Sequence, residues 1–420
     1  MDAALIMKIR LAGLLTVMVS AVSQAQPPAL NLYTFESPPY QMANQEKGGA
    51  NRVYGETADT VVCAANRSGW ETRIRITPQN RAIHALERNM IDGYFAIDPS
   101  AELDNIAKRS DPVALEKWYF FTRGDQPFTD TPRIGVVDGS NEEAWLEAND
   151  YSVFLSVTSA SQLLALLKRA RIDAALMDER VMNGLRLENG DPGMVLERHF
   201  VRYAPLYLYL GESFTSSHPE FLGNFNRMLN SCMAGHLALS DEEEHLIRML
   251  SERLISNISS ILDIPQIIAS GPRQESFTDV MTQDSMWQAL APSGSTQLAD
   301  QILDLAGSRT LHDWKVAQDG VVTEAMIMNN MGTLAAMSRL TTDYWQGDEA
   351  KFQKVLDATR QGLRGIDALY ISPIRYDAST SRFQVTVSAP VSPISDGVPL
   401  GVLMLGLDAE EALRALERRP

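Results

Sequence analysis

Short apolar blocks of strand length alternate with longer segments of helical period over roughly the first half of the chain. The pattern predicts strands at 30–33, 72–76, 94–97, 118–122, 132–138, 172–177 and 203–210, and helices at 53–68, 79–89, 157–170 and 219–233. Because strands alternate with helices throughout, the pattern predicts an α/β unit with mainly parallel sheets.

A single long helix is predicted over 240–264. Ser240 and Glu243 have the spacing of a capping box, and leucines and isoleucines then recur every three or four residues. Pro265 is expected to end the helix, because the residue before a proline is disfavoured in the α region. The segment reads either as an ordinary core helix or as a connecting helix between two different modules. Its position, with unlike patterns on either side, favours the connecting helix.

The pattern changes after Pro265. Helices are predicted at 277–290, 296–306 and 410–418, a short strand or turn at 311–316, and strands at 321–328, 333–337, 367–372, 382–388 and 401–407. Helices followed by a run of strands, with a tight turn at 329–332, are typical of an α+β domain.

Composition limits the class of partner. A chain of 420 residues is expected to form two or three domains, and its formal net charge is −16. That charge argues against binding nucleic acid, whose phosphates it would repel, and against docking on an anionic membrane surface.

The first residues are typical of a secretory signal peptide. Lys8 and Arg10 precede an apolar run, 11–22, and Ser23-Gln24-Ala25 forms a small-x-small site. We expect cleavage after Ala25, giving a signal peptide over 1–25. The apolar run is too short to span a membrane, so the mature chain is expected in the periplasm, without membrane insertion.

Two cysteines, Cys63 and Cys232, lie on two predicted helices. In an oxidising compartment they invite a disulfide that would close a long loop. Two buried free thiols are the alternative, and the sequence leaves both open.

Residues 29–250 resemble the type 2 periplasmic solute-binding fold, the amino-acid-binding-like (family 3) group. The motifs that carry the resemblance are TFESPPY at 34–40, TPQNRAIHALERNMIDGYF at 77–95, SDPVALEKWYFF at 110–121, PRIGVVDGSN at 132–141 and RIDAALMDE at 171–179. The resemblance implies a two-lobed "Venus flytrap" with a ligand cleft between the lobes. It implies a cleft lined by Phe35, Glu36, Tyr40, Arg81, Asp92, Tyr94, Trp118, Ser140, Asn141 and Asp178.

These residue types suit ligand binding, but each also has a structural interpretation. The aromatic side chains could stack on an apolar ligand or belong to the core. Arg81 could clamp a carboxylate or lie on the surface, and Ser140 could hold an anion or only cap a helix. Residues 98–102 contain no arginine, unlike the Thr-x-x-Arg segment usual in amino-acid receptors. An α-amino acid bound in the usual way is therefore not predicted.

Residues 255–412 resemble a single Cache (PDC-type) sensor domain. The motif TTDYWQGDEAKFQK at 341–354 carries the resemblance, supported by TEAMIMNNMG at 323–332 and GVLMLGLDAEEAL at 401–413. The candidate pocket residues are Tyr344, Trp345, Gln346, Asp348, Glu349, Glu324, Asp367 and Tyr370. Aromatic faces and carboxylates together suit a small amine or polar metabolite, although the acidic residues could simply serve a helix N-terminus.

The two resemblances together favour a soluble periplasmic sensor that relays binding of a small polar metabolite to a membrane-bound histidine kinase or diguanylate cyclase. The substrate-binding component of an ABC-type uptake system is an alternative, and a dehydratase-like enzyme a second. The six histidines show no metal-ligand spacing, and no catalytic motif is present, so we expect neither enzyme activity, cofactor nor metal. The ligands, the partner and a homodimer through the long helix are left open.

Overall fold

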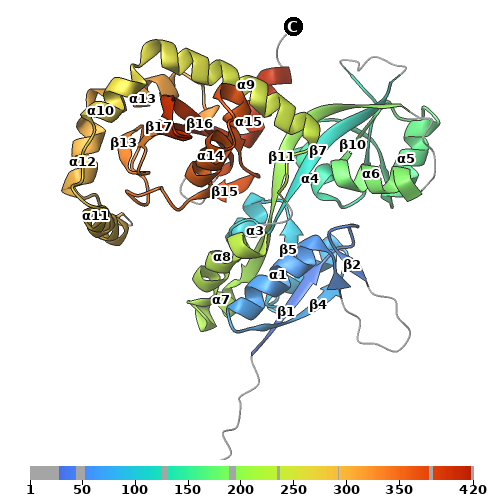
Figure 1. Cartoon of the computed structure of the whole chain (residues 1–420). Helices are drawn as coiled ribbons and strands as arrows, with labels where there is room; N and C mark the ends of the chain where they lie inside the picture. The colour runs from blue at the N-terminus through green and yellow to red at the C-terminus, as the bar shows by residue number, and fades with distance from the viewer. Residues whose placement is uncertain are drawn as a thin grey trace, which may run out of the picture.

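The computed structural model describes residues 28–43, 53–124, 131–188, 195–233, 237–291, 293–377 and 382–417. The predicted signal peptide over 1–25 lies outside these residues. A first module of two α/β lobes is joined to a second, α+β module by a long helix that lies along the second module (Figure 1).

The first lobe is built on three parallel neighbours, β4 (Glu71–Ile76), β1 (Ala29–Thr34) and β5 (Gly93–Ile97). Its other elements are β2 (Met42–Ala43), β3 (Val53–Tyr54), β6 (Ala107–Arg109), α1 (Glu56–Arg67), α2 (Gln79–Glu87), α3 (Ala101–Ile106), α7 (Glu212–Ser217) and α8 (Phe221–Cys232). Helices α1 and α8 cover one face of the lobe's sheet, and buried apolar side chains of β1, β5 and α1 join its core there.

The second lobe contains β8 (Ile134–Val137), β9 (Val153–Val157), β10 (Ala174–Asp178), α4 (Asn141–Ala148), α5 (Ala160–Lys168) and α6 (Glu179–Glu188). Two buried clusters, one on each face of its sheet, hold this lobe together. Strands β10, β8 and β9 run parallel.

Two long strands cross between the lobes, β7 (Ala114–Arg123) and β11 (Leu196–Gly211). They pair antiparallel with each other, and β11 also pairs antiparallel with β5 while β7 pairs antiparallel with β10. The strand order is β4-β1-β5-β11-β7-β10-β8-β9. The α/β class is confirmed, but the expectation of mainly parallel sheets is wrong, because the crossing strands make the sheet mixed.

Helix α9 (Asp241–Ile261) begins with the predicted capping box: Glu243 N–H donates to Ser240 Oγ, and Ser240 N–H donates to Glu243 Oε2. It ends three residues earlier than predicted, and Pro265 lies in the first turn of another helix, α10 (Ile264–Ser270). Proline is tolerated there because the first turn needs no intrahelical N–H donor. The buried stripe Ile247, Leu250, Leu254 and Ile258 belongs to a core cluster with members in both modules.

The second module has a mainly antiparallel sheet in the order β13-β12-β17-β16-β14. Its strands are β12 (Val322–Asn329), β13 (Leu334–Met337), β14 (Tyr370–Ile371), β15 (Arg375–Asp377), β16 (Arg382–Ser395) and β17 (Val398–Asp408). Its helices are α11 (Phe277–Leu290), α12 (Gln297–Asp304), α13 (Ala306–Val316), α14 (Ala350–Arg360), the 3₁₀ turn Gly365–Ala368 and α15 (Ala409–Glu417). The α+β organisation is confirmed.

One element of the second module was predicted wrongly. The strand or turn expected at 311–316 is the end of α13, whose Leu311 and Trp314 face the core three residues apart. Six residues are too few to separate a strand from the last turns of a helix by periodicity alone.

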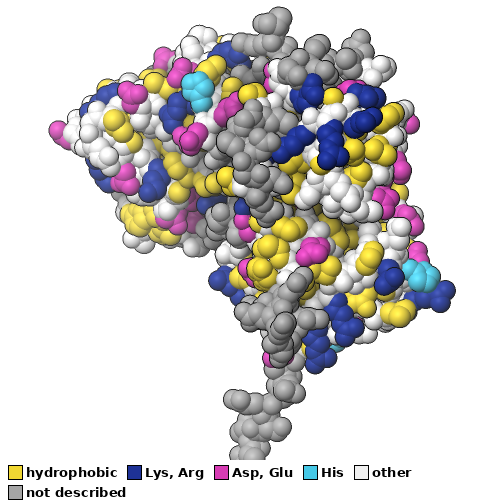
Figure 2. Space-filling view, turned by 90° about the vertical axis from the view of Figure 1, so that its right-hand side faces the viewer, with side chains coloured by type: hydrophobic (Ala, Val, Ile, Leu, Met, Phe, Trp, Pro, Cys, Tyr) yellow, Lys and Arg dark blue, Asp and Glu magenta, His cyan; other side chains and the backbone are white. Residues whose placement is uncertain are grey.

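The negative net charge is not spread evenly. Arg169 and Arg171 are exposed at the end of α5, and Figure 2 shows Lys and Arg side chains gathered on this side of the second lobe. This face of the second lobe is therefore more basic than the chain as a whole.

Candidate functional site

The two lobes touch through Asn141 at the first position of α4, which is 2% exposed. Its Nδ2 donates to the carbonyl oxygen of Ala96 at 3.0 Å, and its Oδ1 accepts from the N–H of Asp98 at 3.0 Å. Ala96 has a φ of +67°, an uncommon conformation for alanine, at the point where β5 meets the other lobe. One amide side chain thus satisfies two backbone groups of the opposite lobe.

Asp178, at the end of β10, makes the second contact between the lobes. Its carboxylate accepts hydrogen bonds from Tyr40 Oη (2.9 Å) on the first lobe and from the backbone N–H groups of Lys117, Arg180 and Val181 (2.9–3.1 Å). Arg180 also forms an ion pair with Glu56 of the first lobe. Donors from both lobes therefore meet at one buried carboxylate.

Carboxyl groups are concentrated at this interface. Burial raises the pKa of Glu142 to about 7, and burial raises the pKa of Asp98 to about 6 despite the opposing charge of Arg202. Burial and the charge of Asp178 raise the pKa of Glu116 well above its ordinary value. Bringing the lobes together therefore favours uptake of protons, or arrival of positive charge, at these carboxyls.

Side chains fill most of the space between the lobes. A cavity beside Tyr40, Thr57, Leu115 and Arg180 has a volume of about 10 Å³, which suits a single water molecule. Trp118 is fully buried on β7, donates its indole N–H to Glu116 Oε2 at 2.8 Å and lies edge-on to Trp145. The cavity beside Tyr40 is therefore too small for a metabolite.

Three of the ten predicted cleft residues, Tyr40, Asn141 and Asp178, make hydrogen bonds between the lobes. Trp118 lies in the core of the second lobe, beside Arg202. The other six have other surroundings. Ser140 caps α4 by accepting from Glu143 N–H, and Asp92 accepts from Asn31 N–H and Nδ2. Tyr94 is in the core beside α2 and α3, Phe35 is half-buried against the core, and Arg81 and Glu36 are exposed.

Sequence reasoning missed six charged residues at or beside this interface: Glu56, Asp98, Glu116, Glu142, Arg180 and Arg202. Glu116 carried a usable signal, because an acidic residue inside the apolar strand ALEKWYFF must be buried or paired. Glu56, Asp98, Glu142 and Arg180 lie at element ends, where nothing local distinguishes them from surface charge. Arg202 lies inside β11 at its irregularity, which no local pattern indicates.

Two helices outside the lobes, α9 and α15, also bond to the crossing strands β7 and β11. Lys117 Nζ of β7 lies 2.5 Å from Glu243 Oε2 of α9, and Tyr203 Oη of β11 donates to Glu243 Oε1 at 2.8 Å. The N–H of Tyr203 donates to Glu410 Oε2 at 3.0 Å, and Arg414 Nη2 donates to the carbonyl oxygen of Val201 at 2.9 Å. These bonds surround an irregularity of β11, where its register against β7 shifts between Phe200 and Arg202.

The second module contains a separate polar arrangement around the motif at 341–354. Asp284 of α11 is 3% exposed and accepts from the N–H groups of Tyr344 and Trp345 at 3.0 and 2.9 Å. Trp287 stacks on Tyr344 with ring centroids 5.7 Å apart. Asp284 and Trp287 thus position the loop that carries the motif.

Among the described residues of this module, four buried polar atoms have no hydrogen-bond partner: Thr323 Oγ1, Tyr344 Oη, Gln346 Oε1 and Ser388 Oγ. Ser388 belongs to a cross-strand row, Met337, Met326, Met404, Ser388 and Tyr370, on one face of the sheet. Tyr344 packs with the methionines of this row. Unpartnered buried polar atoms are uncommon in native proteins, so this face is a candidate for a small polar ligand.

The remaining predicted residues of this pocket differ in burial. Burial raises the pKa of Glu324, with Lys351 opposing. Glu349 precedes α14 without a side-chain capping bond and pairs with Lys351 at 3.1 Å. Trp345 is half-buried against Phe277, whereas Asp348 and Asp367 are exposed.

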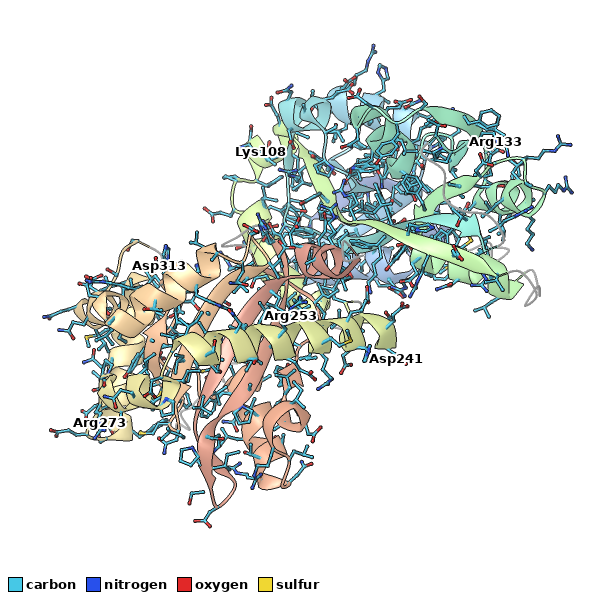
Figure 3. The ribbon with its side chains drawn as sticks, turned by 90° about the horizontal axis from the view of Figure 1, so that it is seen from above. Lys108, Arg133, Asp241, Arg253, Arg273 and Asp313 are labelled. Carbon is cyan, nitrogen blue, oxygen red and sulfur yellow. A yellow bond between two sulfur atoms is a disulfide. The ribbon has the colours of Figure 1, made fainter. Side chains whose placement is uncertain are left out.

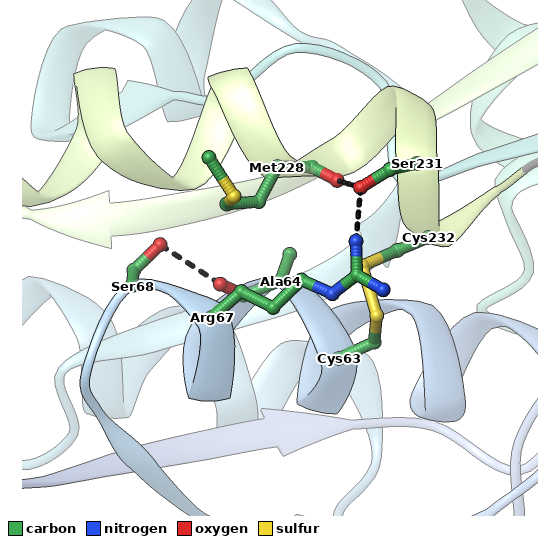
Figure 4. The surroundings of a disulfide bond; sticks show 7 residues. All are labelled: Cys63, Ala64, Arg67, Ser68, Met228, Ser231 and Cys232. Carbon is green, nitrogen blue, oxygen red and sulfur yellow. Dashed lines mark hydrogen bonds between the residues drawn. A yellow bond between two sulfur atoms is a disulfide. The ribbon is translucent and has the colours of Figure 1, made fainter.

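A disulfide joins Cys63 of α1 to Cys232 of α8, so the structure contains the bridge that the sequence left open (Figure 4). Arg67 Nη1 donates to Ser231 Oγ beside the disulfide. The disulfide and this hydrogen bond both attach α8 to α1 of the first lobe. Helix α8 follows the crossing strands in the sequence.

Within the described residues, no three His, Cys, Asp or Glu side chains are placed to hold a metal ion. None of the described helices is both long and apolar enough to cross a membrane.

No protein-family model and no curated protein matches the chain. Solved structures match about half of it. An ancestral arginine-binding protein bound to arginine is 19% identical, with 49% of this chain and 93% of that chain covered and a TM-score of 0.40. A histidine kinase sensor domain with similarity to periplasmic binding proteins is 16% identical (49% and 90% covered, TM-score 0.41). The GluR0 ligand-binding core from Nostoc punctiforme, in complex with (L)-glutamate, is 21% identical (48% and 91% covered, TM-score 0.39).

Proposed function

We propose that this chain is an extracytoplasmic small-molecule sensor, in which separation and closure of the two lobes are passed to the α+β module. The observation that supports it best is the set of bonds from Glu243, Glu410 and Arg414 to the crossing strands. A binding protein that only delivers solute would need no such connection.

The connection is placed where the lobes would bend. Lobe motion in a two-lobed module must be absorbed by the strands that cross between the lobes, here β7 and β11. Lys117, Val201 and Tyr203 lie on these strands, and each is bonded to α9 or α15. Rotation at this point would change the position of both helices, or would break their bonds.

We propose further that the α+β module is a Cache-type sensor with its own ligand on the sheet face that carries Ser388 and Tyr344. The partner that reads the conformation would be a membrane-bound histidine kinase or diguanylate cyclase. A ligand of either module favours one conformation only if it binds that conformation more tightly than the other.

The experiment begins with a thermal-shift screen of the mature protein against a metabolite panel, because a ligand of the native state raises its melting temperature. Hydrogen exchange of α15 is then compared with and without a ligand that binds the two-lobed module. We expect binding to change the exchange of the described backbone at 409–415.

The double variant Glu410→Gln/Arg414→Gln should bind the same ligand with similar affinity but lose the change in α15. Glu252→Gln, on the exposed face of α9, is the matched control and should keep it. If α15 exchange is insensitive to ligand in the unmodified protein, the relay is excluded.

A further inference from the structure

A pocket of about 280 Å³ opens at the free edge of the second module's sheet, and one of its lining residues, Met337, also belongs to the row beside Tyr344. Helices α12 and α13 pack against edge strand β13 from opposite faces, and the pocket lies where the three meet. Figure 3 shows Asp313, at one rim, on the far side of this module from the second lobe, where Arg133 is labelled. Leu303 and Met337 give the pocket apolar walls.

Two buried hydroxyls line the pocket. Ser308 and Ser338 are 1% and 2% exposed, and their oxygens accept the N–H groups of Met337 (3.1 Å) and Ala325 (2.8 Å). Each oxygen keeps a second lone pair, so both hydroxyls can accept another hydrogen bond.

His312 offers a further acceptor. Its Nδ1 lies 3.0 Å from the carbonyl oxygen of Ser338. Because a carbonyl oxygen can only accept, Nδ1 carries the hydrogen, and Nε2 of the neutral ring is left as an acceptor. His312 itself is exposed, so this nitrogen is accessible.

The pocket is lined by one cation, Arg309, and one carboxylate, Asp313. Arg309 is neutralised by Asp304, at 3.1 Å, whereas the exposed Asp313 carboxylate has no bond to any other side chain described in the structure. His312 and Asp313 also lie in the last turn of α13, where the helix dipole favours positive charge. Free acceptors, one unpaired carboxylate and an apolar wall therefore meet in one pocket.

We propose that this pocket binds a small organic amine. Its ammonium group donates to the Asp313 carboxylate and His312 Nε2, and its hydrocarbon chain lies against Leu303 and Met337. A carboxylate ligand would be repelled by Asp313, and an alcohol would gain nothing from its charge.

The pocket is connected to α9 through a hydrogen bond of α13. Trp314, in the same turn of α13 as Asp313, donates its indole N–H to Asn257 of α9 at 2.7 Å. Binding in the pocket is independent of the proposed sensor role, so either can fail without the other.

The test uses the full chain with ¹³C-methyl-labelled methionine and leucine, titrated with n-butylammonium. We expect saturable shifts of the Met337 and Leu303 methyl signals. We expect none at Met404, which lies two strands away from Met337 in the sheet. Butyrate and butan-1-ol, matched in chain length, should bind at least tenfold more weakly.

Asp313→Asn should raise the dissociation constant for n-butylammonium at least tenfold, and Glu252→Gln should leave it unchanged. Leu303→Trp, which fills the pocket, should abolish the shift of Met337 while the Met404 signal stays native. The proposal is wrong if butan-1-ol binds as tightly as the amine, or if Asp313→Asn changes the dissociation constant less than twofold.

Discussion

The hydroxyl of Tyr203 donates to Oε1 of Glu243 while Lys117 contacts Oε2 of the same carboxylate, so both crossing strands share one acid of α9. Glu243 is 3% exposed, and its Oε2 also accepts the N–H of Ser240 in the capping box. Glu243, a member of the capping box at the start of α9, therefore also bonds to both strands that cross between the lobes.

Glu243→Gln is expected to lower the free energy of unfolding by about 3 kcal/mol, because it leaves the largely buried Lys117 without its counter-charge. Glu244→Gln is the control. Its ion pair with Arg248 is largely exposed, and its loss should cost about 0.5 kcal/mol or less. Urea unfolding of the two variants measures both values, and equal losses would contradict the role assigned to Glu243.

The closed arrangement of the lobes should weaken as the pH rises from about 4 to about 7. Asp98 and Glu142 have folded pKa values of about 6 and about 7, above their ordinary values, so the closed form binds more protons than a form with solvated carboxyls. The resulting stability is complete below the ordinary pKa values and is lost as the pH passes through the raised ones.

Small-angle scattering across this pH range measures the change in lobe separation. Glu142→Gln removes one of these titrations and should reduce the pH dependence, while Glu143→Gln on the same helix should not. A radius of gyration that stays constant from pH 4 to 8 in the unmodified protein would disprove proton-linked closure.

Ser388→Ala is expected to leave stability unchanged or raise it by about 1 kcal/mol, because the lost hydroxyl has no partner. Ser372→Ala should instead cost about 1 kcal/mol, since the buried Ser372 Oγ accepts from Thr386 N–H and donates to the carbonyl oxygen of Pro373. Thermal unfolding compares the two. If Ser388→Ala proves the more destabilising, the hydroxyl has a structural partner and the ligand interpretation of this face is weakened.

Removing the disulfide, by Cys63→Ala with Cys232→Ala, should destabilise the first lobe by about 4 kcal/mol. The bridge spans a sequence separation of 169, and closing such a long loop restricts the unfolded chain strongly. Calorimetry should show a lower melting temperature for the two-lobed module. Reduction of the unmodified protein should reproduce the shift and leave the double variant unchanged.

Local signals predicted the elements best. The capping box of α9 needs only Ser240 and Glu243, three residues apart, and the alternation of strands and helices identified most of both modules. The end of α13 was misread because a single helical turn resembles a short strand. The antiparallel pairing of β7 and β11 could not be predicted from the sequence, because it depends on contacts between segments distant in the chain.

The candidate site was harder to predict because it depends on contacts distant in sequence. Tyr40 and Asp178 are 138 positions apart, and nothing near either residue indicates that one will bond to the other. Tyr94 is the opposite case. It is an aromatic residue at a position that suited a ligand contact, but its side chain lies in the core. Glu116 was recoverable, because burial of its charge follows from the apolar strand around it.

The bond between Tyr203 and Glu410 also bears on how the molecule folds. It joins residues 207 positions apart, so it forms only after the whole second module has been made and has docked. The two-lobed module can collapse earlier, because three of its buried clusters lie entirely within it. Its crossing strands then lack the bonds from Glu410 and Arg414. An intermediate with loosely held lobes should therefore precede the native state, and its last step should be the arrival of α15.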